Sequence, residues 1–257
     1  MPAIGEPLLA DPTLPLCSAC LPLHSGGRRH ICDTCFHHGL QPLAAHRCPL
    51  CSQSLTAPDA PCVNWLCKPD AARAFTAAYA CGLYTGSLGV AISEWKYNNG
   101  DWADRFAELL DAWMTARPDI MNTVDLIVGN PSARDRATGR HIEDLIAALT
   151  ARAPHQPLAP ADDVLTKTHS TPSSAAARRE RVPGGALAAA HAHGDAVQVA
   201  GDVTGLRILL IDDVLSSGNQ VNAVAQRLLN AGAADVRVLV LARTPWKPRT
   251  RPSEGKY

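Results

Sequence analysis

The feature that most constrains the fold is the stretch ILLIDDVLSSGNQV, from Ile208 to Val221. Four apolar residues run directly into two adjacent acids, Asp212 and Asp213, and a turn rich in serine and glycine follows. We expect a strand at 207–211, a helix from about residue 220 to 231 and a second strand in VRVLVLA. Strand, turn, helix and strand in this order predict a parallel βαβ unit. The chain is therefore expected to be an α/β protein with a parallel sheet flanked by helices.

The preceding residues show further patterns of the same class. A strand or hairpin is predicted at 74–88, and two helices within 90–118, separated at Asn98-Asn99-Gly100, with Pro118 at the end of the second. A buried strand is predicted at 124–128 and a helix at 141–153. The stretch from 154 to 202 is rich in Ala, Pro, His, Ser and Arg and has little periodicity. We interpret it as a long mobile segment, either a linker or a functional lid.

Asp212, Asp213 and the turn behind them predict a ligand site. Ligands of parallel sheets bind outside the carboxyl ends of the strands. A small, hydroxyl-bearing turn before a helix presents backbone N–H groups to an anion. The carboxylates suit the hydroxyls of a diol, and the turn Ser216-Ser217-Gly218-Asn219-Gln220 suits a phosphate. The pattern therefore indicates a sugar that carries both groups.

The run from Ile208 to Gln220 resembles the thirteen-residue signature of the type I phosphoribosyltransferases, although Gln220 stands where that family usually has Thr. These enzymes bind 5-phosphoribosyl-1-pyrophosphate (PRPP) together with Mg²⁺. The resemblance implies that Asp212 and Asp213 are catalytic residues that hold the 2′- and 3′-hydroxyls of the ribose. It also implies that Ser216, Ser217, Gly218, Asn219 and Gln220 cradle the 5′-phosphate.

Eight of the nine cysteines lie between residues 17 and 67, mostly as C-x-x-C pairs. Two intervening residues bring two sulfurs to one side of a tetrahedral zinc ion. The set Cys17, Cys20, Cys32 and Cys35 matches a four-thiolate site; the set Cys48, Cys51, Cys62 and Cys67 matches less well, because its last pair is wider. We expect at least one structural zinc ion, with consecutive or interleaved pairing. Residues 1–70 are predicted to form this module and residues 71–257 the α/β domain.

The order of these features resembles the ComF (GntX-like) family. The matching features are the cysteine pairs, the segment YTGSLGVAISEWKY, the strand and loop IVGNPSARDR, and the acidic signature. The resemblance implies that Arg136 and Arg140 bind pyrophosphate. The chain departs from the family after Arg140, where His141-Ile-Glu-Asp replaces the usual Gly-Phe-Asn-Gln. We interpret His141 as a helix-start residue, and we favour an ordinary helical role for Lys96 over binding of pyrophosphate or a partner.

Composition narrows the functional classes. Lys plus Arg equals Asp plus Glu at 24 each, so no net field draws the chain to nucleic acid or membranes. Without a recognisable secretion signal or apolar span, we expect a cytoplasmic protein. One hypothesis is transfer of a phosphoribosyl group from PRPP to a nitrogen nucleophile. The alternative, which the family's link to competence suggests, is a PRPP-sensing or vestigial accessory protein in the handling of single-stranded DNA, with a DNA-uptake or helicase-like partner.

Overall fold

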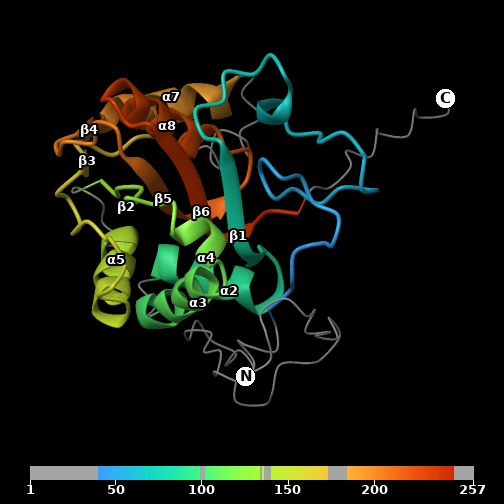
Figure 1. The fold of residues 1–257 in the computed structure, drawn as a ribbon, viewed down its shortest axis with the longest axis horizontal. Coiled ribbons are helices and arrows are strands. Elements are labelled where there is room, and N and C mark those ends of the chain that lie inside the picture. Colours follow the sequence, from blue (N-terminus) through green and yellow to red (C-terminus); the bar gives the residue numbers. More distant parts are fainter. Residues whose placement is uncertain (1–39, 99–101, 134, 136–139, 173–183, 246–257) are drawn as a thin grey trace.

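The computed structural model describes residues 40–98, 102–133, 135, 140–172 and 184–245. Their elements, in chain order, are η2 (Trp65–Cys67), β1 (Ala77–Leu83), α2 (Gly86–Asn98), α3 (Ala103–Thr115), α4 (Pro118–Met121), β2 (Leu126–Gly129), α5 (His141–Arg152), β3 (Leu165–Lys167), α7 (Gly185–Ala196), β4 (Val197–Val199), β5 (Arg207–Leu215), α8 (Asn219–Asn230) and β6 (Asp235–Arg243). Figure 1 shows their arrangement.

The main sheet has four parallel strands in the order β1-β6-β5-β2. Its two central strands, β5 and β6, are joined by α8, so the predicted βαβ unit is confirmed. In register, Leu210 of β5 lies opposite Val128 of β2 on one side and Val238 of β6 on the other. The predicted α/β class with a parallel sheet is therefore confirmed.

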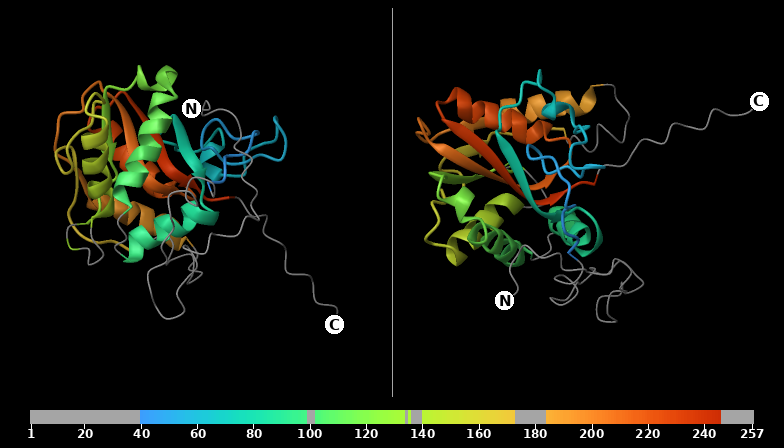
Figure 2. Two further views of the ribbon diagram at one scale, coloured as in Figure 1. Left: turned by 90° about the horizontal axis from the view of Figure 1, so that it is seen from below. Right: turned by 45° about the vertical axis from the view of Figure 1, so that its right-hand side comes forward.

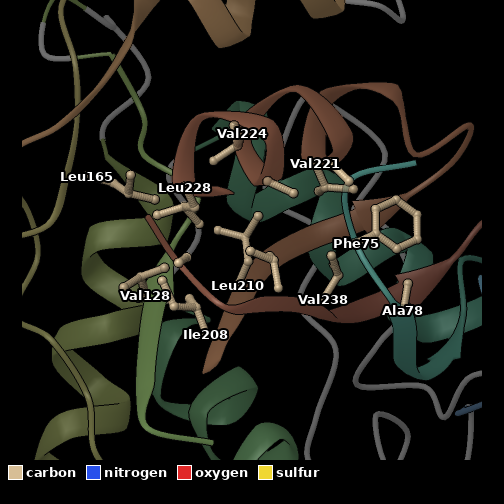
Figure 3. Packing of buried hydrophobic residues seen from close by; sticks show 14 of the residues in the cluster. Phe75, Ala78, Val128, Leu165, Ile208, Leu210, Val221, Val224, Leu228 and Val238 are labelled. Atoms are coloured by element: carbon tan, nitrogen blue, oxygen red, sulfur yellow. The ribbon is translucent and has the colours of Figure 1, made fainter. Parts of the chain in front are cut away.

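Side chains alternate between the two faces of this sheet, as extended strands require. Leu209 and Ile211 join a core with α2, α3 and α5, whereas Ile208 and Leu210 join a core with α8. Figure 1 shows α2, α3 and α5 on one side of the sheet and α7 and α8 on the other. Figure 3 shows Leu210 and its neighbours packed beneath α8. Both faces are covered, which explains why the strands are apolar almost throughout.

Several sequence expectations are refined by the structure. The stretch at 74–88 contains the single strand β1, and Gly86 begins helix α2, so it is not a hairpin. The two helices on either side of Asn98-Asn99-Gly100 are confirmed as α2 and α3. Pro118 does not end the second helix; it occupies the first turn of the short helix α4, a position where its missing N–H costs nothing.

The stretch from 154 to 202 contains more regular structure than its composition suggested. Strands β3 and β4 form a small antiparallel sheet, and α7 leads directly into β4. Helix α7 escaped recognition because its sequence, GALAAAHAHGDA, consists largely of alanine and has no amphipathic pattern. Residues 173–183 lie outside the described part of the chain, and the mobility of the stretch stays a prediction.

Residues 40–70 lie against the β1 edge of the main sheet (Figure 2). The Ala78 N–H donates to the carbonyl of Leu50 at 2.9 Å, and the Ser52 hydroxyl donates to the carbonyl of Ala78 at 2.7 Å. Leu66 is fully buried in the same core as α8. Among the described residues, no helix is long and apolar enough to cross a membrane.

The contact between α7 and α8 depends on a glycine. A Cβ atom added at Gly194 of α7 would lie only 2.8 Å from the Cβ of Ala223 on α8. We expect Gly194→Ala to lower the free energy of unfolding by about 1–3 kcal/mol through overpacking, even though alanine favours a helix. Chemical denaturation measures this change.

Gly89 provides the matched control, because it also lies in a helix, α2. Its added Cβ would meet the nearest atom of Tyr84 at 3.4 Å, an ordinary contact. Gly89→Ala should therefore stabilise the protein by up to about 1 kcal/mol. An equal gain in Gly194→Ala would contradict the close packing of α7 on α8.

Candidate functional site

The acidic pair lies within the central strand and not behind it. Strand β5 was expected to end at residue 211, but it continues through Asp212 and Asp213 to Leu215. Its pairing with β6 also continues, with Asp212 opposite Val240. Because successive side chains in a strand point to opposite faces, the two carboxylates leave the sheet on different sides. Each therefore has its own set of partners.

Asp213 points to the face covered by α2 and α5. Its carboxylate accepts from the Lys96 ammonium at 2.6 Å and lies 2.9 Å from Nε2 of His141. Burial by itself would raise the pKa of Asp213, but Lys96 and His141 outweigh burial and hold this pKa well below its ordinary value. Asp213 is therefore an ionised, fully paired carboxylate at neutral pH.

Asp212 points to the opposite face and is also buried. Its carboxylate accepts from the side-chain amide of Asn130 at 3.1 Å and from the Asp213 backbone N–H at 2.9 Å. Burial, together with the negative charge of Asp213, raises the pKa of Asp212 to about 7. The two neighbouring acids therefore differ in protonation state: near neutral pH Asp213 is ionised, whereas Asp212 is protonated in part of the molecules.

A pocket of about 250 Å³ lies at the carboxyl end of β5, and Asp212 forms part of its wall. The remaining lining residues are Val214, Leu215, Ser216, Ser217, Gly218, Asn219, Gln220 and Val221. The structure thus brings Asp212 together with all five residues of the predicted turn. Asp213 is not among the lining residues, in keeping with its position on the other face.

The turn in this pocket leads into helix α8 through Gly218. Its φ angle of +86° is in the left-handed region, which favours glycine. The first turn of α8 carries no acidic residue, so no carboxylate of the helix itself offsets the partial positive charge of its N–H groups; the Asn219 N–H donates to Oγ of Ser217 at 3.4 Å. This arrangement suits an anion, because the N-terminus of a helix carries partial positive charge.

The segment around η2 supports this turn from the other side. The Asn64 side-chain amide donates to the carbonyl of Ser217 at 3.2 Å, and the Trp65 indole N–H donates to Oδ1 of Asn219 at 3.0 Å. A Cβ at Gly218 would lie 3.1 Å from Cδ1 of Leu66. Three consecutive residues, 64–66, therefore contact the turn directly.

Arg243, at the end of β6, joins the same turn to the cysteine segment. Arg243 is 2% exposed. Its Nε donates to the carbonyl of Cys51 at 2.9 Å, and its Nη1 donates to the carbonyls of Leu215 at 2.6 Å and Ser216. Its Nη2 donates to Oε1 of Gln53 at 2.6 Å. A buried arginine bonded mainly to carbonyl oxygens restricts the backbone that carries them. Arg243 therefore holds the start of the turn against the cysteine segment.

Four cysteines of this segment form a cluster that could hold a metal ion. The sulfurs of Cys48, Cys51, Cys62 and Cys67 all lie within 4.8 Å of one another. The cluster thus joins the pair Cys48 and Cys51 to the next pair in the sequence, Cys62 and Cys67, which is the consecutive pairing. Burial and the neighbouring thiolates raise the pKa of Cys62 to about 12, and a cation among the sulfurs would relieve this repulsion. Cys17, Cys20, Cys32 and Cys35 lie outside the described residues.

The arginines expected to bind pyrophosphate are placed differently. Arg136 lies outside the described residues. Arg140 precedes α5 and donates to both carboxylate oxygens of Asp162, at 2.5 and 2.7 Å, and to Glu143 at 3.0 Å. The Ser132 backbone N–H in the loop after β2 also donates to Glu143, at 2.8 Å. Both groups are thus bonded to carboxylates of the chain itself.

The sequence did not identify three residues beside the acids: Lys96, His141 and Asn130. His141 does begin helix α5, as expected, but it also contacts Asp213. Lys96 lies in the last turn of α2, and Asn130 follows β2. The Gly-Asn-Pro sequence after an apolar run was the one local signal for Asn130, because ligand residues often follow strands. Lys96 and His141 had no such signal.

Comparison with known proteins finds a matching family description and two curated relatives. Residues 160–254 match the family described as Phosphoribosyl transferase domain, a range that includes the acids and the turn. Two curated relatives, both named DNA utilization protein YhgH, come from Salmonella typhimurium (strain LT2) and Salmonella typhi. Each is 28% identical over 229 residues, which are 83% of this chain and 90% of the relative.

The solved structures that match the chain include two phosphoribosyltransferases. A hypoxanthine phosphoribosyltransferase from Staphylococcus aureus aligns with 60% of this chain and 68% of its own, at 15% identity and a TM-score of 0.31. A purine phosphoribosyltransferase from Pyrococcus horikoshii aligns with 62% of this chain and 96% of its own, at 14% identity and a TM-score of 0.31.

The raised pKa of Asp212 predicts a pH-dependent stability. Between its ordinary value of 3.8 and about 7, the folded state binds more protons at Asp212 than the unfolded state. The free energy of unfolding therefore falls, through this group, as the pH rises across that window. Asp212→Asn should gain about 1–3 kcal/mol relative to the wild type between pH 5 and pH 8, measured by urea unfolding.

Asp144→Asn is the control, because Asp144 is an exposed acid on α5. Its unfolding free energy should follow the wild type at every pH. Parallel pH curves for the wild type and Asp212→Asn would show that Asp212 titrates normally and would contradict the unequal acid pair.

Proposed function

We propose that the chain is a phosphoribosyltransferase-like protein of the ComF type, which binds PRPP and transfers its 5-phosphoribosyl group to a nitrogen nucleophile. The observation that carries the proposal is the pocket at the carboxyl end of β5. It combines the carboxylate of Asp212 with the anion-binding turn of residues 216–220. A ribose that carries a 5′-phosphate has one group for each half of this pocket.

The turn would bind the 5′-phosphate. The backbone N–H groups at the start of α8 and the hydroxyls of Ser216 and Ser217 are suitable donors, and Gly218 lets the backbone approach the ligand closely. Asn219 and Gln220 begin the helix and add amide side chains. A phosphate here would interact favourably with the α8 dipole, because the first turn of α8 carries no competing carboxylate.

The acids would serve the ribose and the charge that develops on it. Asp212 faces the pocket and would accept from the ribose hydroxyls. Asp213 would act from behind, holding Lys96 and His141 in place. Departure of pyrophosphate leaves cationic character at the anomeric carbon, which nearby carboxylates stabilise. Mg²⁺ bound together with the donor would supply neutralisation of the charge on the leaving pyrophosphate.

The cluster of Cys48, Cys51, Cys62 and Cys67 would hold a structural zinc ion. Four thiolates close the coordination sphere, so the ion supplies stability and takes no part in the reaction. Cys51 and the residues around η2 contact the turn of residues 216–220, directly or through Arg243. The zinc ion would therefore support the phosphate site from a distance.

A second function has an observation in its favour. Arg140 and the Ser132 N–H, which lie where pyrophosphate is expected, are both bonded to carboxylates. A protein with this arrangement would bind the ribose phosphate without cleaving PRPP efficiently. Such a protein would act as a PRPP-sensing accessory factor, and the name of the curated relatives, DNA utilization protein, suggests a process in which it would act.

Ligand titration tests the common part of both functions. Calorimetry with PRPP and Mg²⁺, and with ribose 5-phosphate, should show binding to the wild type. The double variant Asp212→Asn/Asp213→Asn should lose at least about tenfold in affinity, because Asp212 no longer offers a charged acceptor to the ribose and Asp213 no longer holds Lys96 and His141 in place. Asp144→Asn, an exposed acid away from the pocket, should bind like the wild type. A wild type without affinity for either ligand refutes both functions.

Pyrophosphate release separates the enzyme from the accessory protein. The wild type is incubated with PRPP, Mg²⁺ and a pool of nucleobases and amines, and free pyrophosphate is measured. Release that depends on both an acceptor and Asp212 supports the transferase. Binding of PRPP without release supports the accessory function.

The zinc site predicts a loss of ligand affinity when its cysteines are removed. Cys48→Ser/Cys51→Ser should contain one zinc ion fewer per chain, measured by elemental analysis, and bind ribose 5-phosphate several-fold more weakly. Replacement is preferable to chelation, because a chelator would also act on any ion held by Cys17, Cys20, Cys32 and Cys35. Cys81→Ala, outside the cluster, is the control. Unchanged affinity after zinc loss would contradict support of the turn.

A further inference from the structure

A row of buried polar side chains leads away from Asp212 through Asn130. The Asn130 amide donates to Asp212 at 3.1 Å, and Nε2 of His193 lies 2.9 Å from Oδ1 of Asn130. Nδ1 of His193 lies 2.9 Å from the Lys167 ammonium, which also donates to Thr171 at 2.9 Å. Asp212, Asn130, His193 and Lys167 are each at most 8% exposed.

The hydrogens in this row have one direction. A lysine ammonium can only donate, so Nδ1 of His193 must accept and Nε2 must carry the proton. Nε2–H then donates to the carbonyl oxygen of Asn130, which leaves the amide of Asn130 to donate to Asp212. Burial and the charge of Lys167 lower the pKa of His193 to about 3, in agreement with a neutral ring. Every bond therefore polarises the next one towards the carboxylate.

Four different parts of the fold supply these groups. Lys167 ends β3, His193 lies in α7, Asn130 follows β2, and Asp212 belongs to β5. An isolated bridge between Ala133 and Lys167 also joins the loop after β2 to the small sheet. The row thus runs from the small sheet to the carboxyl edge of the main sheet.

We propose that His193 and Lys167 are positioning residues for Asp212. Acting through Asn130, they fix one carboxylate oxygen, so that the other can accept from a ligand, and they favour the ionised form of the carboxylate. The identity of that ligand rests on the proposed function, whereas the effect on Asp212 does not. Neither residue lines the pocket, so neither is expected to touch the ligand.

The other charged groups around Asp212 act from different directions. On its own strand Asp213 opposes its ionisation, while Lys96 of α2 favours it. His141 of α5 acts on Asp213. The first turn of α8 contains no charged side chain. Lys167 of β3 and His193 of α7 are therefore the groups whose influence on Asp212 passes through Asn130.

The direct test follows the Asp212 carboxyl carbon by NMR during a pH titration of the free protein labelled with ¹³C at aspartate. Asp212→Asn identifies the signal. In Lys167→Met and His193→Leu the midpoint should rise by about half a pH unit or more, because the donor row to the anion is lost. His193→Gln should restore it, because its amide can accept from Lys167 and donate to Asn130.

Controls separate this effect from general loss of structure. Lys167→Arg keeps the charge and should keep the wild-type midpoint, as should Lys68→Met, which removes an exposed lysine. If Lys167→Met does not fold, Lys167→Gln repeats the test with a polar side chain. Variants that fold and lose thermal stability but keep the wild-type Asp212 midpoint would overturn the proposal. The row would then stabilise the packing of β3, α7 and β2 without acting on the Asp212 carboxylate.

A second measurement relates the row to the ligand. Ribose 5-phosphate is titrated at pH 6 and pH 8 by calorimetry, and Lys167→Met should lose several-fold more affinity at pH 6, where more of its Asp212 is protonated. An equal loss at both pH values would contradict the proposal. If the wild type binds no ribose 5-phosphate, the proposed function fails, and the NMR midpoints still decide whether Lys167 and His193 act on Asp212.

Discussion

Two adjacent carboxylates buried on a central strand need compensation for their charge, and this need accounts for much of the structure around them. The twofold alternation of β5 sends Asp213 to one face and Asp212 to the other. On the first face, α2 and α5 deliver Lys96 and His141. On the second face, Asn130 is held by His193 of α7. Helices on both sides of the sheet therefore contribute polar groups to a single point.

The cysteine segment meets a second constraint at the same place. A turn that binds an anion must keep its N–H groups free and still hold its shape. Here the carbonyl groups of the turn are bonded instead: Asn64 donates to Ser217, and Arg243 donates to Leu215 and Ser216. Arg243 also bonds the carbonyl of Cys51. This support through carbonyl oxygens does not use the N–H groups of the turn as donors.

The sequence predicted the parts of this design whose signals are local. The βαβ unit from β5 to β6 and the turn of residues 216–220 lie within one continuous stretch, and the cysteine pairs carry their own spacing. Contacts between distant residues were not predictable: Lys96 and His141 are 117 and 72 positions before Asp213. His193 is a particular case, since a histidine in this alanine-rich helix, which also carries His191, has no pattern that distinguishes it from a surface residue.

The unequal environments of the two acids also give them different tasks. A carboxylate that neutralises Lys96 and contacts Nε2 of His141 is fixed in its charge and geometry, which suits Asp213 for holding neighbouring elements. A carboxylate whose pKa is raised to about 7 costs stability when it ionises, because its charge is buried beside another. A ligand that donates hydroxyl hydrogens to Asp212 would reduce this cost. Part of the binding free energy at the pocket would therefore come from removing an unfavourable buried charge that the ligand-free protein carries. The charge conflict on β5 would therefore favour the state with ligand bound, provided that the Asn130 amide, held by His193 and Lys167, keeps the Asp212 carboxylate directed at the pocket.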